Sequence, residues 1–131
     1  MHTFAELVAS RKAWIEAELK PWCHRAALRD LRLAEQAWPD IAGKVDPEKT
    51  LWLWAWSRFT DLVNPDLQAI DETRRLTLTL RDGRSLTGFP DARQSQQGSL
   101  VLLCADPDNP RRFVEVGPLT LDEIASIAAA E

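Results

Sequence analysis

RLTLTLRDG, residues 75–83, is the stretch that decides the fold of the second half of the chain. Polar and apolar residues alternate strictly along it, as in a strand with one buried face, so we expect the three leucines to point inward. Asp82-Gly83 follows directly and is a strong signal for a tight primed turn, because both residue types tolerate a positive φ. The sequence therefore predicts a β-hairpin whose return strand is 84–89.

Two more strands are predicted after a polar loop at 91–98. Leu100 to Cys104 is a short apolar run bounded by turn residues, as in a strand buried on both faces, and 112–116 follows as the next strand. The segment 120–123, Thr-Leu-Asp-Glu, has the capping-box pattern and predicts a short C-terminal helix. Its apolar face would consist of Leu121, Ile124, Ala125 and Ala128.

Helices are predicted throughout the first half of the chain. A capping box at Thr3 to Glu6 begins a helix that we expect from Phe4 to Leu19. Pro21 lacks an amide hydrogen, so it should break or kink that helix and open a second one, which runs to about Ala37. Asp46-Pro47-Glu48 reads as the start of a third helix covering 51–60.

The segment 51–57 leaves two readings open. On a helix, its apolar residues form one stripe that includes Trp52 and Trp56 and places both indoles in the core. Trp52, Trp54 and Trp56 also alternate, however, as three residues on one face of a strand would. We favour the helix, in which Trp54 shares its face with Arg58 and Asp61.

Composition indicates one ordinary globular domain. The 131 residues are 45% hydrophobic and 27% charged, with a net charge of -4 that comes from the second half of the chain. We expect a single domain over 1–131, helical over 1–70 and β-rich over 71–131, with a cytoplasmic location. No apolar run approaches the ~18 residues of a membrane span. Cys23 and Cys104 lie far apart in apolar surroundings, which favours two reduced, buried thiols.

The β-rich half resembles the Sm-like family of small β-barrels over residues 75–117. The family's first motif has alternating apolar residues, a glycine, and a second glycine five positions later. This sequence supplies the three leucines of 75–83, then Gly83, Leu86 and Gly88 in that spacing. The resemblance implies a small antiparallel barrel or strongly bent sheet, Sm-like or SH3-like, in which Gly88 allows the second strand to bend. The family's Asp and Asn at the RNA-contacting loop have no clear counterpart near Asp91, and Pro90 interrupts that strand.

Candidate contact residues come from the tryptophans and the arginines. Trp54 is the best single candidate for an interface residue, because exposed indoles can stack on partner groups. Arg74, Arg75, Arg81 and Arg84 surround the first hairpin and would form a basic patch if they met on one face. The alternative is that they protect strand ends against association.

No motif points to chemistry. Cys23 and His24 are helix neighbours that would not face one another, and the Cys and His residues are too scattered for a metal site. We therefore expect no enzyme, no cofactor and no metal. The sequence favours a non-enzymatic interaction module that binds a protein or a copy of itself through Trp54 and the barrel edge. The alternative is an Sm-like regulatory protein that binds RNA, which the acidic second half disfavours.

Overall fold

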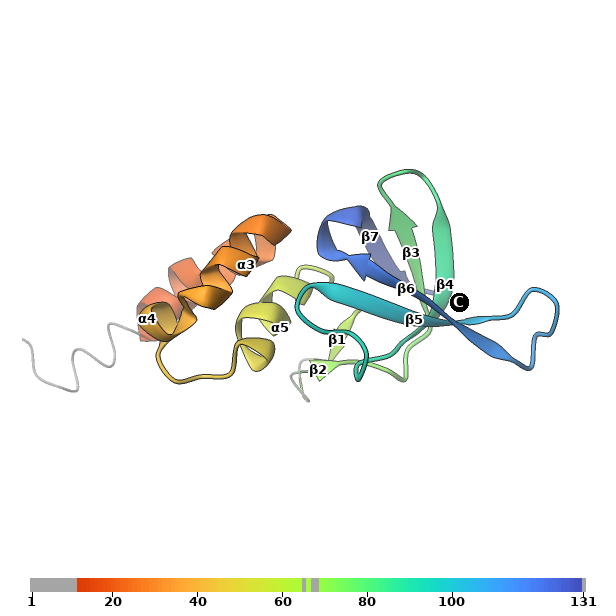
Figure 1. Cartoon of the computed structure of the whole chain (residues 1–131), viewed down its shortest axis with the longest axis horizontal. Coiled ribbons are helices and arrows are strands. Elements are labelled where there is room, and N and C mark those ends of the chain that lie inside the picture. The colour runs from red at the N-terminus through yellow and green to blue at the C-terminus, as the bar shows by residue number, and fades with distance from the viewer. Residues whose placement is uncertain (1–11, 65, 67–68, 131) are drawn as a thin grey trace, which may run out of the picture.

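The computed structural model describes residues 12–64, 66 and 69–130, and shows an α+β fold in which helices precede a five-stranded antiparallel sheet (Figure 1). Residues 4–11 of the first predicted helix lie outside the described part. The helical elements that precede the sheet are the π-helical turn η1, the helices α2 to α5 and the 3-10 turn η2. Their bounds are η1 Ile15–Leu19, α2 Lys20–Arg25, α3 Leu28–Gln36, α4 Trp38–Ala42, η2 Pro47–Lys49 and α5 Leu51–Trp56.

Pro21 lies in the first turn of α2, as predicted, but the chain does not leave the helical conformation before it, so the prediction of a break there is wrong. The π-helical turn η1 precedes α2 directly, and the Lys20 amide donates to the Ile15 carbonyl five residues back. Such a wide turn relieves the crowding that a proline ring causes in the preceding turn. The chain leaves the helix only at Ala26 and Ala27, which are both extended.

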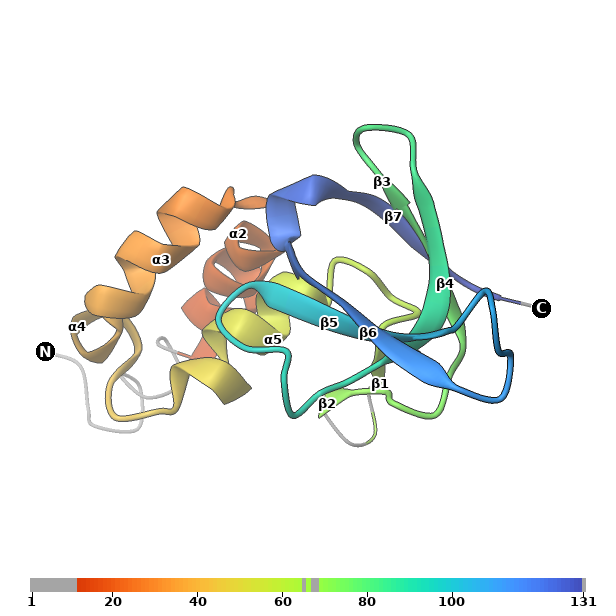
Figure 2. The same cartoon turned by 45° about the vertical axis from the view of Figure 1, so that its right-hand side comes forward.

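Asp122 caps the first turn of α3 from the other end of the chain. Its Oδ1 accepts a hydrogen bond from the Leu28 amide at 3.0 Å, and no side chain of the local sequence caps this helix. The Asp122 carbonyl in turn accepts from Arg81 Nε at 2.7 Å. Figure 2 shows the C-terminal segment meeting the start of α3.

The helical reading of the tryptophan-rich segment is confirmed, although α5 ends at Trp56 rather than near Thr60. Leu51, Trp52, Ala55 and Trp56 are all buried, which is the stripe that a helix predicts. Trp54 lies off that stripe and is half-buried. Helical periodicity wins here because it buries two indoles and two aliphatic side chains together.

The main sheet contains five strands in the order β6-β5-β4-β3-β7, and a separate pair is formed by the two-residue strands β1 and β2. The predicted hairpin is confirmed as β3 and β4, although its turn differs in detail. The Leu80 carbonyl accepts a hydrogen bond from Gly83 N at 3.0 Å. Gly83 is the one residue of this turn with a positive φ, because among the described non-glycine residues only Gln97 has one. The loop therefore has three residues and not two. The bounds are β1 Val63–Asn64, β2 Ala69–Ile70, β3 Leu76–Leu80, β4 Ser85–Pro90, β5 Ser99–Ala105, β6 Phe113–Thr120 and β7 Ile124–Ala129.

Strand β4 changes partner at Gly88. Residues 85–88 pair with β3, whereas Phe89 and Pro90 pair with β5. A Cβ on Gly88 would lie 2.4 Å from the Leu103 carbonyl oxygen, so only glycine allows β5 to approach this closely. Strand β4 thus leaves β3 and begins to pair with β5 at a residue without a side chain.

The sheet must curl strongly, because its two outer strands are consecutive in the chain. Four strand spacings of ~4.8 Å would separate β6 and β7 by ~19 Å in a flat sheet. They are joined only by the 3-10 turn η3, Leu121–Glu123, whose four Cα steps span at most ~14 Å. No ladder joins β6 to β7 among the described residues, so the sheet does not close into the predicted barrel.

The predicted C-terminal helix is wrong beyond its first turn. The capping box forms as expected, with Thr120 and Glu123 bonded reciprocally, but residues 124–129 form strand β7. An irregularity in the pairing with β3 adds one residue to β7 between Ile124 and Ser126. That extra residue puts Ile124 and Ile127 on the same buried face, and their three-residue spacing imitates a helix.

One hydrophobic cluster contains residues from both halves of the chain. Trp38 and Trp52 from the helices and Leu76, Leu102 and Leu121 from the β-rich half are all buried in it. Cys23 and Cys104 are also buried and free, as predicted. Among the described residues, no helix combines the length and the apolar character that crossing a bilayer requires.

Candidate functional site

Strand β6 forms one open edge of the main sheet. The Asp106 amide donates to the Arg112 carbonyl at 2.8 Å, which fixes how the hydrogen bonds alternate along the β5–β6 pair. Val114 and Val116 are therefore bonded to β5, whereas the amides and carbonyls of Phe113 and Glu115 point away from it. No described strand lies on that side, so these groups are free to pair with another chain.

The opposite edge, strand β7, is more protected. The Ala130 amide donates to the Arg75 carbonyl, so the same alternation directs the Ala129 amide outward. The carboxylate of Asp61 accepts from that amide at 3.2 Å. The strand also carries the pairing irregularity described above, which is a common means of making an edge unsuitable for pairing. The two edges of the sheet thus differ, and β6 is the accessible one.

An apolar patch lies on the outer face of the sheet beside the β6 edge. Pairing places Phe89, Leu103 and Glu115 on one face, and Phe113 two residues from Glu115 shares it. Phe113 is 53% exposed and packs edge to face on Phe89, with ring centroids 6.4 Å apart. Figure 1 shows that the β5–β6 hairpin extends beyond the rest of the sheet. We call Phe89, Leu103, Ala105 and Phe113 the outer-face patch.

The predicted interface residue Trp54 lies in a different place, on the helical side. Its indole packs edge to face on Trp38, with centroids 6.0 Å apart, and Lys20 Nζ lies 5.3 Å from its ring centroid. A surface pocket of about 390 Å³ includes Trp54, His24 and Thr60 in its lining. Trp54 is thus partly engaged within the molecule, and its role in an interface stays a prediction.

The four predicted arginines lie in two groups. Arg74 and Arg75 precede β3, and Arg81 and Arg84 follow it, so six residues of extended chain place the groups ~20 Å apart. Arg74 is paired with Asp61 at 3.3 Å, and Arg84 with Asp82 at 2.8 Å. Burial lowers the pKa of Arg58; Asp122 and Cys23 oppose that shift, and the charge of Arg81 adds to it.

Arg58 holds the end of helix α2, a role that sequence reasoning did not assign. Its guanidinium donates to the carbonyls of Cys23 at 2.7 Å, Ala26 at 2.8 Å and Ala55 at 2.9 Å. Two of these carbonyls belong to the last turn and C-cap of α2, which have no further helical amides to bond. A cation near a helix C-terminus is also favoured electrostatically.

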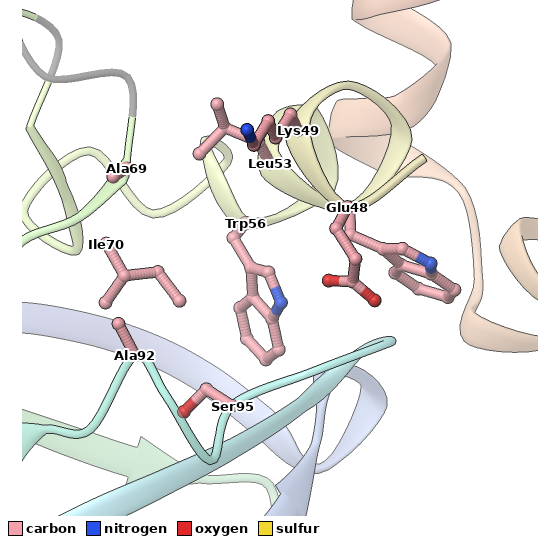
Figure 3. Close-up of a pocket in the computed structure, with 9 residues that line it drawn as sticks. Glu48, Lys49, Leu53, Trp56, Ala69, Ile70, Ala92 and Ser95 are labelled. Atoms are coloured by element: carbon pink, nitrogen blue, oxygen red, sulfur yellow. The ribbon is translucent and has the colours of Figure 1, made fainter. Parts of the chain in front are cut away.

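A second hollow of about 470 Å³ lies between α5, β2 and the loop before β5 (Figure 3). Trp56 and Ile70 line it, and the Glu48 carboxylate faces the nitrogen edge of the Trp56 indole. Burial in this pocket raises the pKa of Glu48. The hydrogen bond from the Gln97 amide lowers that pKa, and the nearby carboxylates of Glu35 and Asp46 raise it further.

The described residues show no prepared nucleophile at Cys23. Burial raises the pKa of its thiol to about 11, so the thiolate is scarce at neutral pH. Burial, followed by the charges of Arg58 and Lys20, lowers the pKa of the neighbouring His24. No group of three or more His, Cys, Asp or Glu residues converges as metal ligands in the described ranges.

Sequence reasoning missed Phe113, Phe89 and Glu48. The alternation of Phe113, Val114, Glu115 and Val116 could have placed Phe113 on the face opposite the valines, but the sequence contains no sign of which strand is an edge.

Comparisons of the chain with models of protein families, with curated proteins and with solved structures found no match.

Proposed function

We propose that this protein is a non-enzymatic interaction module that binds another protein chain, or a second copy of itself, by strand addition to β6. The supporting observation is the pair of unbonded outward amides at Phe113 and Glu115 on an open edge. Main-chain hydrogen bonds would supply affinity, and the exposed Phe113 ring would anchor the partner on the outer-face patch. Trp54 remains a candidate for a second contact.

The test measures the mass of the protein in solution and the hydrogen exchange of these two amides. Light scattering across a concentration series should show mass increasing with concentration. Amide hydrogen exchange at Phe113 and Glu115 should slow over the same concentration range. Phe113→Lys should abolish both effects, because it removes the anchor and adds a charge at the edge. Leu33→Lys is the matched control, since Leu33 is 59% exposed on α3 and far from the sheet edge in sequence.

If the protein stays monomeric at every concentration, the partner is a different chain and not a second copy of this one. A free peptide with the sequence of residues 112–117 is then the probe, because it can pair with the same edge. Assembly in which the Phe113 and Glu115 amides still exchange freely would contradict strand addition at β6. So would the failure of both self-association and peptide binding.

We infer further that residues 75–117 have an Sm-like or SH3-like arrangement. Support comes from the partner change at Gly88, at the motif's second glycine, and from the strong curl of the sheet. RNA binding is the second candidate function, and one observation favours it. Arg58 and Arg81 both line a groove of about 390 Å³ with Thr60 and Ser126. Binding to labelled RNA should then weaken steeply as salt rises, and RNA binding without salt dependence would contradict phosphate contacts.

A further inference from the structure

The hollow between α5 and the loop before β5 contains a hydrogen-bond donor without an acceptor. Trp56 is only 3% exposed, and its Nε1 has no hydrogen bond among the described residues. No side-chain nitrogen or oxygen in the described part of the chain is sealed from solvent without a partner. The indole nitrogen must therefore reach solvent, and the pocket that Trp56 lines provides the opening.

An acceptor faces this donor across the same pocket. Glu48 accepts a hydrogen bond from the Gln97 amide through Oε1 at 3.2 Å, and its Oε2 has no partner among the described residues. Figure 3 shows the carboxylate and the nitrogen edge of the indole turned toward one another, and no hydrogen bond joins them. A group placed between them must accept from Trp56 and donate to Glu48.

Two of the other polar side chains around the pocket are already occupied, and the third, Lys49, points its ammonium away from the Glu48 carboxylate in Figure 3. Trp52 Nε1 donates to Glu35, and Ser95 Oγ donates to the Asp91 carbonyl and accepts from the Val101 amide. They can therefore contribute shape but little further hydrogen bonding. Apart from Lys49, the remaining lining is apolar and includes Leu53, Ile70 and Ala92.

We propose that this pocket binds a small uncharged organic molecule through a hydroxyl or a primary amide held between Trp56 Nε1 and Glu48. Both groups donate and accept at once, which the facing pair requires. A carboxylate ligand has no hydrogen to donate to Glu48, and an ammonium offers no acceptor to the indole. A volume of about 470 Å³ is within the usual range for small-molecule sites.

Four compounds that share one ring test the polar group alone: benzyl alcohol, benzamide, benzoate and benzylammonium. The protein labelled with 15N gives an indole signal for each of its six tryptophans, and Trp56→Phe assigns one of them. Benzyl alcohol or benzamide should shift the Trp56 signal saturably, with a dissociation constant on the order of 1 mM. Comparing these two distinguishes hydroxyl from amide recognition.

Glu48→Gln provides the matched variant, because it keeps the side-chain shape on an exposed residue and removes the charge. It should weaken binding about tenfold, since hydrogen bonds to charged groups are the stronger ones. Glu16→Gln, in the π-helical turn η1, should change nothing. Benzoate binding as tightly as benzamide, or no saturable shift with any of the four compounds, would overturn the proposal. Phe113→Lys should leave ligand binding intact, because the β6 edge and this pocket share no residue.

Discussion

Replacing Arg58 by methionine should destabilise the fold more than any change at the exposed arginines. Methionine keeps most of the aliphatic stem but removes donors to three backbone carbonyls, two of them at the end of α2. Hydrogen bonds to charged groups contribute roughly 1.5–3 kcal/mol each, and water can replace part of that at a half-buried site. We expect the free energy of unfolding to fall by about 2–4 kcal/mol.

Urea unfolding followed by tryptophan fluorescence measures this loss. With a slope of about 1.5 kcal/mol/M, the midpoint should fall by about 2 M while the slope stays constant. Arg74→Met is the control, because Arg74 makes one exposed ion pair with Asp61 that is worth roughly 0–1 kcal/mol. Equal losses in the two variants would refute the view that Arg58 stabilises the end of α2.

Two other changes follow from close packing. Gly88→Ala should cost about 2 kcal/mol or more, measured by the same urea assay, because the new Cβ would lie 2.4 Å from the Leu103 carbonyl oxygen; an unchanged midpoint would mean that β5 can move away. The Cys23 thiol keeps its proton up to a pKa of about 11 when folded, against 9.0 as the ordinary value. The unfolded chain therefore binds fewer protons between these values, so stability should fall as pH rises from 9 to 11, and Cys23→Ala should remove that part of the pH dependence.

The β-hairpin was predictable because local rules and burial agree there. Strict alternation in 75–81 matches a strand whose three leucines are buried, and Gly83 takes the positive φ that the turn requires. The tryptophan-rich segment was less certain, since both periodicities fit. Burial of a four-residue stripe around Trp52 decided it, and that burial depends on the tertiary packing.

The errors have identifiable physical causes. Before Pro21, a wider π-helical turn keeps the chain helical although proline has no amide hydrogen to donate, which no rule about single residues predicts. At the C-terminus, one extra residue in β7 gives Ile124 and Ile127 a helical spacing on a strand. The β6 edge could not be foreseen either, because which strands are outermost depends on the order in the sheet. Exposure of Phe113 follows from that order.

The cap that Asp122 places on α3 has a consequence for the nascent chain. A ribosome releases the helical segments first, yet the Leu28 amide receives its carboxylate partner only after residue 122 has emerged. Until then water must satisfy the start of α3, even if the rest of that helix has formed. Vectorial synthesis therefore leaves this helix uncapped until residue 122 has left the exit tunnel.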